Sequence, residues 1–318
     1  MIELSTTRHN PFVDPQLHVW GWEIPVYLFF GGLVAGMMVL GGLALRRMAR
    51  GDDPRSFFSL QAPLLGFVLI NLGMGALLLD LTHKLYVWRV FMTFQPASPM
   101  SWGAWVLMLV YPVLIGSWLG GLDEQARAWA KKLPLSSMIQ TIFEYADSRR
   151  GAIQSASIGL GLGLGVYTGL LLGTMAARLP WNTAALGPLF LVSGVSTGAA
   201  LLLLLNREPE RAPLLVRWDT AAILVELGIL AVMLLGFRSA GARGRLVVDA
   251  LLGGPWTPWF WSLVVVAGLL VPLSLNLLEQ RRHLPMNRLA PLLVLVGGFG
   301  LRFVLVAVGQ DLSYSLLP

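Results

Sequence analysis

The chain is 318 residues long; 56% of its residues are hydrophobic, only 13% are charged, and its mean hydropathy is +0.69. Because soluble domains carry about a quarter charged residues, this composition excludes an ordinary soluble protein and predicts one that crosses a membrane several times. The net charge of +6 would suggest nucleic-acid binding in a soluble protein. In a membrane protein, basic loops on one side explain it better, and the sequence contains no nucleic-acid motif.

Eight apolar segments are long enough to cross a bilayer, which takes about 20 helical residues. They are residues 23–45, 61–79, 102–120, 152–176, 184–205, 213–236, 257–278 and 290–309. We therefore expect an all-α integral membrane protein with about eight transmembrane helices, arranged as two four-helix bundles. Residues 1–120 and 152–176 would form the first bundle, residues 121–151 a cytoplasmic connector, and residues 184–318 the second bundle.

The distribution of cations orients these helices. Fifteen of the 23 Lys and Arg residues lie in the first, third, fifth and seventh loops, and seven lie in the N-terminal segment and the even loops. The odd loops are therefore predicted to be cytoplasmic and both termini periplasmic. Residues 1–22 are polar, so we expect no cleavable signal peptide. The connector is predicted to be an interfacial amphipathic helix whose apolar residues face lipid or protein: Trp129, Ile139, Ile142 and Phe143.

The sequence offers few residues that could hold a redox cofactor. The sequence has no cysteine, so the chain cannot ligate an iron–sulfur cluster by thiolates or form a disulfide. None of the four histidines (His9, His18, His83 and His283) lies inside an apolar segment, which argues against bis-histidine haem. The sequence shows no P-loop, no nucleophile–base pair and no cluster of metal ligands. We therefore expect no haem, no iron–sulfur cluster and no metal in this chain.

The connection at residues 80–105, DLTHKLYVWRVFMTFQPASPMSWGAW, is unusually polar and aromatic for a loop between two membrane helices. It is predicted to lie on the outer face. Seven candidate site residues from three helices and two loops are expected near this face: Glu23, Tyr27, Asp80, His83, Tyr167, Trp181 and Asn182. If its helix continues to residue 176, Tyr167 lies about 13 Å below the outer end.

These side chains offer carboxylates, phenols, an imidazole and an indole. Such a set suits a flat, apolar molecule with two polar oxygens that takes up or releases protons, as a quinone does. We hypothesise that Asp80, alone or with His83, accepts protons in catalysis. Structural interpretations stay open: Glu23 suits a helix N-terminus, Asp80 could pair with Lys84, and the aromatic residues are typical of the membrane interface.

A second polar group is predicted deep in the membrane, where charged side chains are costly and therefore candidates for function. Glu226 and Arg302 are both expected about 18–20 Å from the cytoplasmic side, and we hypothesise that they form an intramembrane ion pair. The pair could be purely structural, or it could belong to a proton path that Asp219 extends toward the cytoplasm. Close helix packing is predicted along a stripe of glycines: Gly161, Gly165, Gly169 and Gly173.

Six sequence elements resemble the NrfD/PsrC family, the quinone-handling membrane subunits of polysulfide-reductase-type complexes. They are WGWEIPVYLFFGGLVAG (20–36), LLLDLTHKLYVWR (77–89), SPMSWGAW (98–105), YTGLLLG with ARLPWN (within 167–182), LFLVSGVSTGAAL (189–201) and LVGGFGLRFVLV (295–306). The family usually reads D-L-G-R-P after the second helix. This chain departs from that pattern, with the residues Asp80, Leu81, Thr82, His83 and Lys84.

The resemblance implies a quinone site near the periplasmic end of the first bundle, formed by Glu23 or Tyr27, Asp80 and Tyr167. Menaquinone or ubiquinone would exchange electrons there with a periplasmic ferredoxin-like iron–sulfur subunit docked over residues 80–105. That subunit would connect to a molybdopterin or multihaem cytochrome subunit. The chain would then be a multi-pass subunit of an oxidoreductase complex for anaerobic respiration in the bacterial inner (cytoplasmic) membrane, and not an enzyme by itself.

Two other functions are compatible with parts of the sequence. A purely structural anchor would tether a periplasmic reductase without contacting quinone. A small-molecule or ion transporter usually has a broken helix or an inverted repeat near the midplane. The polar cluster expected here lies at one face, which favours the quinone-linked function over transport.

Overall fold

The computed structural model of the chain describes residues 20–47, 56–130, 136–175, 178–205, 209–282 and 288–312. The predictions for the polar N-terminal segment, for the location of the two termini, and for His9, His18 and His283 lie outside these residues. Within them, the regular elements are helices.

Eight of the described helices are long and apolar enough to cross a membrane, which confirms the predicted number of spans. They are α1 (Glu23–Arg47), α2 (Phe57–Asp80), α4 (Pro99–Gly121), α7 (Arg150–Gly173), α8 (Leu186–Leu205), α9 (Ala212–Ser239), a seventh span formed by η4 (Trp259–Leu270) and α11 (Val271–Arg282), and α12 (Leu289–Asp311). The shorter elements are η1 (Lys84–Tyr86), α3 (Trp88–Met92), α5 (Glu124–Ala130), α6 (Ser136–Ser148), η2 (Leu179–Trp181), η3 (Pro209–Arg211) and α10 (Gly241–Leu252).

Local sequence explains several helix boundaries. Pro99 lies in the first turn of α4, where the N–H that proline lacks would have no helical partner anyway. The helix α7 ends at Gly173, before the predicted residue 176. The seventh span begins as a π-helix. This conformation is defined by its i→i+5 backbone hydrogen bonds, which hydropathy does not predict.

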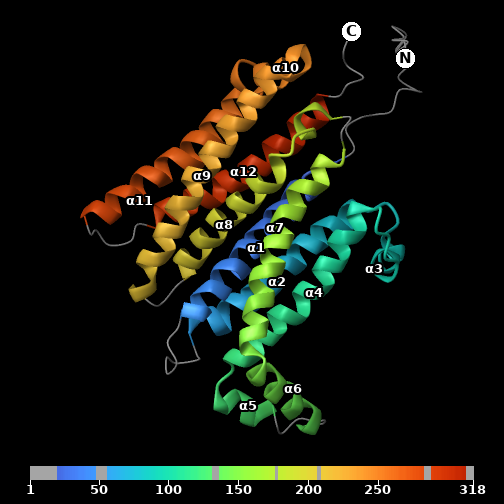
Figure 1. Cartoon of the computed structure of the whole chain (residues 1–318), viewed down its shortest axis with the longest axis vertical. Coiled ribbons are helices and arrows are strands. Elements are labelled where there is room, and N and C mark those ends of the chain that lie inside the picture. The colour runs from blue at the N-terminus through green and yellow to red at the C-terminus, as the bar shows by residue number, and fades with distance from the viewer. Residues whose placement is uncertain are drawn as a thin grey trace.

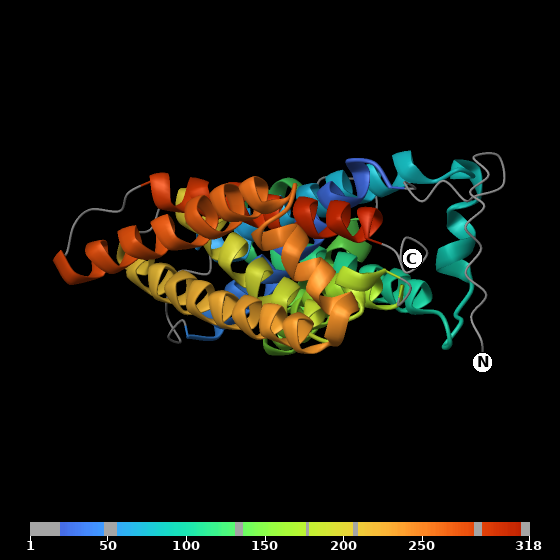
Figure 2. The same ribbon diagram turned by 90° about the horizontal axis from the view of Figure 1, so that it is seen from above.

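The helix α1 lies at the centre of the molecule (Figure 1), where it contacts α2, α7, α8 and α12. In its most apolar stretch 78% of the residues are buried, against 28% in α4 and 33% in α2. The helices α2 and α4 therefore lie at the periphery of the helix bundle. From above, the segment around α3 (teal) lies at one end of the elongated molecule and the end of α11 (orange-red) at the other (Figure 2). The division into two four-helix bundles stays a prediction, because α1 and α8 also pack extensively on each other.

Glycines allow the closest helix contacts. A Cβ at Gly36 of α1 would overlap the backbone at Gly194 of α8. On α7, Gly161 packs on α1, whereas Gly165 and Gly169 pack on the start of α8. The predicted packing role is therefore confirmed for these three glycines, while Gly173 has its nearest neighbour atom at 3.8 Å and is not needed for close approach.

The two ends of the molecule differ. The helices α5 and α6 lie at one end, and α3, α10 and η2 lie toward the other (Figure 1). We call these the α6 end and the α3 end. The described helix ends that flank the odd loops lie toward the α6 end, as alternating helix direction requires. Their assignment to the cytoplasmic side stays a prediction from the loop charges.

The connector at the α6 end contains two helices, α5 and α6, where a single amphipathic helix was expected. A two-pronged ion pair joins them: Arg127 Nη1 lies 2.6 Å from Asp147 Oδ2, and Nη2 lies 3.0 Å from Oδ1. Arg127 also donates to the carbonyl of Leu119 at the end of α4. Of the predicted apolar face, Phe143 is buried, whereas Trp129 is 66% exposed.

Candidate functional site

Two tyrosines from different helices are buried together toward the α3 end. Tyr27 of α1 is 4% exposed and Tyr167 of α7 is 6% exposed. Their phenol groups are close enough to interact electrostatically. Because α7 ends at Gly173, Tyr167 lies six residues, or about 9 Å, from the helix end, and not the 13 Å that was predicted. The two tyrosines are thus brought together as expected.

A glycine of α4 makes room for this pair. A Cβ built at Gly103 would overlap the ring and hydroxyl of Tyr167. Gly103 belongs to the segment SPMSWG, which sequence reasoning singled out without giving this glycine a role. The only sequence feature that could have indicated this role is the position of Gly103 inside the motif SPMSWG. The segment therefore serves both the surface loop and the packing of Tyr167.

Two carboxylates lie beside the tyrosines. Glu23 is the first residue of α1 and Asp80 is the last residue of α2, and their charges interact. The two helices run in opposite directions, so the start of one lies next to the end of the other. Glu23 and Tyr27 are one turn apart on α1, which puts the carboxylate pair next to the tyrosine pair. No ion pair joins Asp80 to Lys84 among the described residues; Lys84 belongs to η1 and is exposed.

His83 lies outside this cluster. It is exposed, it precedes η1, and its ring faces Tyr86 at a centroid distance of 6.4 Å. Its predicted part in proton transfer stays a prediction. The loop that follows is held by Ser101, which accepts a hydrogen bond from Gln95 N and donates one to Thr93 O.

The same loop exposes a group of large apolar side chains. They are 43–88% exposed and comprise Leu85, Tyr86, Trp88, Met92, Phe94, Met100 and Trp102. We call this group the apolar loop surface. Arg89 covers part of it, with its guanidinium carbon 4.6 Å from the ring centre of Tyr86. Exposed apolar surface of this kind is typical of a binding or membrane-contacting site.

The side chain of Trp181 is buried at the α3 end. It is 1% exposed, stacks on Trp20 at 5.2 Å, and donates from Nε1 to the carbonyl of Leu305 on α12. Gln310 holds Trp20 by two hydrogen bonds, accepting from its N–H at 2.8 Å and donating to its carbonyl at 2.9 Å. Sequence reasoning missed Gln310. Asn182 donates its backbone N–H in the same loop, and quinone contacts of Trp181 and Asn182 stay predictions.

Arg302 is a fully buried cation between α1, α8 and α12. Its Nε donates to Leu28 O at 3.2 Å, and its Nη1 donates to Ser193 Oγ at 3.1 Å and to Gly298 O at 2.7 Å. A Cβ at Gly32 would overlap the guanidinium, so this glycine leaves the space that Arg302 fills. A direct ion pair with Glu226, as predicted, is not formed within 4 Å between these two described residues, although their charges interact electrostatically.

Glu226 is connected to Arg302 indirectly. Ser193, which accepts from Arg302, also hydrogen-bonds Glu226, and the two charges interact electrostatically. Asp219 lies seven residues before Glu226 on α9. It is fully buried and accepts hydrogen bonds from Ser196 and Asn276, each at 2.7 Å. The structure thus gathers the three predicted residues into one buried polar network.

The network continues toward the α6 end. Thr220 follows Asp219 on α9, and its hydroxyl accepts a hydrogen bond from Gln280 Nε2 at 2.8 Å. Gln280 lies two residues before the end of α11. Asn276 and Gln280 come from a helix that sequence reasoning did not connect with the charged residues. Among the described residues no group of three metal-ligating side chains occurs.

A bundle of membrane-spanning helices with buried ionisable groups defines a multi-pass integral membrane protein with polar sites inside it. A family model described as "Polysulphide reductase, NrfD" matches residues 9–312. The chain belongs to this family.

Relatives cover nearly the whole chain. Protein NrfD of Escherichia coli (strain K12) is 30% identical over 306 residues, which are 92% of this chain and 95% of the relative. The C chain of the polysulfide reductase of Wolinella succinogenes is 28% identical and covers 92% of this protein and 94% of the relative. The C subunit of the selenate reductase of Mesobacillus selenatarsenatis is 27% identical over 90% of this protein and 73% of the relative. The protein is thus a membrane subunit of the reductase-complex type.

Proposed function

We propose that this chain is the quinone-reactive subunit of a respiratory reductase complex in the bacterial inner membrane. The observation that carries the proposal is the buried pair of Tyr27 and Tyr167 next to the carboxylates of Glu23 and Asp80. Family membership supports it, because relatives are named as subunits of polysulfide and selenate reductases.

The residues present fit a quinol substrate. Quinol supplies two electrons and two protons when it is oxidised to quinone. The hydroxyl groups of Tyr27 and Tyr167 can donate or accept hydrogen bonds to its two oxygens, and the carboxylate of Asp80 can accept a proton and pass it to the α3 end. Gly103 keeps Tyr167 in position. In the opposite direction of electron flow, the same groups would deliver protons to quinone.

A substitution of Asp80 tests the proposal. In the intact complex, Asp80→Asn keeps the shape of the side chain but cannot accept a proton, so quinol oxidation should fall by about 100-fold or more. Asp249→Asn on the exposed face of α10 is the matched control and should leave the rate unchanged. A wild-type rate in Asp80→Asn would remove Asp80 from the mechanism.

A measurement of quinone binding distinguishes this function from that of a purely structural anchor. Tyr167→Phe removes one hydroxyl from the buried pair and should weaken binding of a quinone analogue to the complex, while assembly stays intact. If the analogue binds neither wild type nor variant, the protein only tethers its partners.

We further propose that a ferredoxin-like iron–sulfur subunit docks on the apolar loop surface and passes electrons onward to a molybdopterin or multihaem cytochrome subunit. The position of this surface at the same end as the tyrosine pair supports the proposal. A cluster bound there would be on the side of the membrane where the quinone site lies.

The buried network supports a second proposal, a proton path from the membrane interior to the α6 end. The supporting observation is a set of buried polar groups spaced along α9. Glu226 is linked through Ser193 to Arg302, and Asp219 with the Thr220–Gln280 hydrogen bond lies nearer the α6 end. Glu226→Gln should lower proton movement coupled to quinol oxidation in vesicles, while Glu144→Gln on the exposed helix α6 should not. If assembly and turnover are both untouched, Glu226 serves neither structure nor proton transfer.

A further inference from the structure

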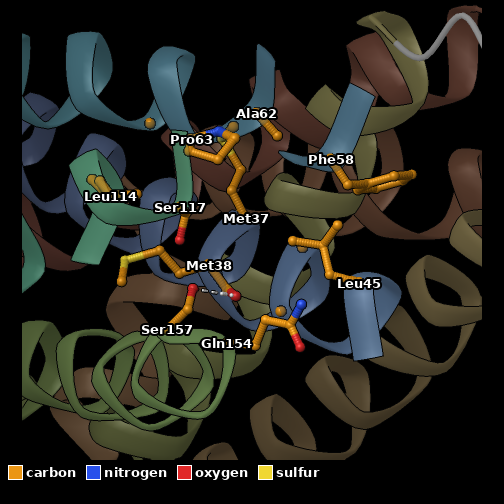
Figure 3. Close-up of a pocket in the computed structure, with 13 residues that line it drawn as sticks. Met37, Met38, Leu45, Phe58, Ala62, Pro63, Leu114, Ser117, Gln154 and Ser157 are labelled. Atoms are coloured by element: carbon orange, nitrogen blue, oxygen red, sulfur yellow. Dashed lines mark hydrogen bonds between the residues drawn. The ribbon is translucent and has the colours of Figure 1, made fainter. Parts of the chain in front are cut away.

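A pocket opens between α1, α2, α4 and α7 near the α6 end, away from the tyrosine pair (Figure 3). Its cavity volume is about 20 Å³, so the pocket is narrow, and it is open to the surroundings on one side. Gly41 on its wall lies 14 residues after Tyr27, which is about 21 Å along α1. The pocket therefore does not belong to the candidate quinone site.

The deeper wall of the pocket is apolar. Met37 and Met38 of α1, Phe58 of α2 and Leu114 of α4 line it. At Gly41 a Cβ would meet no atom within 4 Å, so the wall is hollow at this point. A flexible hydrocarbon chain suits a narrow apolar space of this kind, because methionine side chains adapt their shape to it.

Polar side chains lie on the α4 and α7 side of the same pocket. Ser157 donates its hydroxyl to Met38 O at 3.0 Å, as the dashed line in Figure 3 marks. The side chains of Ser117 and Gln154, in contrast, make no hydrogen bond to any residue that the structure describes. Each lies four residues from the end of its helix, or about 6 Å along the axis. Their depth matches the ester groups of a phospholipid, which lie just inside the headgroups.

A cation lies next to two lining residues of the pocket, Leu45 and Gln154. Arg46 follows the lining residue Leu45 on α1, is exposed, and is held over α7 by donating to Ser155 Oγ. A guanidinium at the level of the headgroups attracts an anionic phosphate.

We infer that this pocket is a binding site for one anionic phospholipid. The phosphate would lie at Arg46, the ester oxygens at Ser117 and Gln154, and an acyl chain along Met37, Met38 and the hollow at Gly41. The lipid would fill the junction of four helices at the α6 end and would not take part in electron transfer.

The inference is tested by filling the hollow. The full-length protein, purified together with its copurifying subunits, is given phosphatidylglycerol or phosphatidylcholine, and bound lipid is counted by native mass spectrometry. Wild type should retain one phospholipid with a preference for phosphatidylglycerol, and Gly41→Leu should lower its occupancy by about tenfold. Gly75→Leu, on the exposed face of α2 where a Cβ also meets no atom within 4 Å, should bind like wild type.

Two further variants examine the headgroup contact and the folding of the protein. Arg46→Gln should lower the preference for phosphatidylglycerol at least about threefold, and Arg46→Lys should keep it. Gly41→Ala is the folding control: if it elutes from size-exclusion chromatography as wild type does, α1 tolerates a substitution at this position. The inference is overturned if Gly41→Leu retains the lipid, if Arg46→Gln keeps the full preference, or if the bound molecule has the mass of a quinone.

Discussion

The position of Tyr167 depends on a glycine of another helix, Gly103 of α4. The phenol of Tyr167 occupies the space that a Cβ of Gly103 would take, and this contact sets the position of its hydroxyl beside Tyr27. The sequence indicated both tyrosines, because a phenol this far inside an apolar helix needs a partner. It could not indicate Gly103, because the contact joins residues 64 positions apart.

Gly103→Ala should therefore move Tyr167 without changing any titratable group. We expect quinol oxidation by the complex to fall by about 10- to 100-fold, since small displacements of positioning groups have effects of this size. Assembly, measured by copurification of the partner subunits, should persist. Gly75→Ala is the control, because its new Cβ meets open space. Equal rates in the two variants would show that Tyr167 does not need its present position.

Arg302 shows a second limit of sequence reasoning at the residue scale. Its depth in the membrane suggested an ion pair with Glu226, but its guanidinium is satisfied mainly by backbone carbonyls, including those of Leu28 and Gly298. Carbonyls inside α1 and α12, together with the gap at Gly32, supply these acceptors only in the folded molecule. A guanidinium with five donors can use them, whereas an ammonium cannot reach all of them at once.

Arg302→Gln should consequently destabilise the protein by about 1–3 kcal/mol, because buried acceptors lose their donors. Arg302→Lys should restore stability only partly. Thermal unfolding in detergent, followed by tryptophan fluorescence, measures both variants, and the exposed Arg238→Gln is the reference. The cross-linking role of Arg302 is contradicted if its variant unfolds at the same temperature as the reference.

At the scale of the elements, apolar length predicted each of the eight spans, because the bilayer demands about 20 helical residues whatever the fold. The predicted ends were less accurate, and the connector proved to contain two helices. Its sequence has an amphipathic pattern but does not encode that Arg127 of α5 reaches both Asp147 of α6 and the end of α4.

This connector clamp should depend on pH. The hydrogen bonds from Arg127 hold the pKa of Asp147 below its usual value. Because the folded-state pKa is the lower one, the clamp contributes stability above about pH 3.9, and this contribution is lost as the pH falls through the folded-state pKa. The effect should stay below about 1 kcal/mol, since Asp147 is partly exposed to solvent.

Hydrogen–deuterium exchange of residues 136–148, corrected for intrinsic rates, measures the clamp. Protection of α6 should stay constant from pH 6 to about 4 and decrease as the pH is lowered further, within the window set by the depressed pKa. Asp147→Asn should show low protection at every pH. A pH-dependent loss of the same size in this variant would assign the effect to another group.

At the scale of the whole molecule, the arrangement separates three regions by depth. The tyrosine and carboxylate pairs lie toward the α3 end, the buried network runs from the interior toward the α6 end, and the pocket lies near the α6 end beside a different set of helices. Each region is assembled around α1 or α8, the helices with the largest buried fractions together with α12.

The apolar loop surface should govern partner binding. Replacing Leu85 and Met92, which are 88% and 74% exposed, by serine should reduce copurification of the iron–sulfur partner, since exposed apolar side chains of this size commonly anchor interfaces. Binding of a quinone analogue should persist, because the tyrosine pair is not altered. Leu246→Ser, on α10 at the same end, is the control. Unchanged copurification would exclude this surface as the docking site.

The sequence by itself determined the membrane class, the number of spans, the candidate tyrosines and carboxylates, and the family resemblance that the comparison then confirmed. These properties follow from hydrophobic length, charge bias and local motifs, which act along the chain. The tertiary structure decided the partners of Tyr167 and Arg302, the path of the network through α11, and the pocket near Gly41. Each of these depends on where one helix lacks a side chain and another fills or leaves that space, which no single segment encodes.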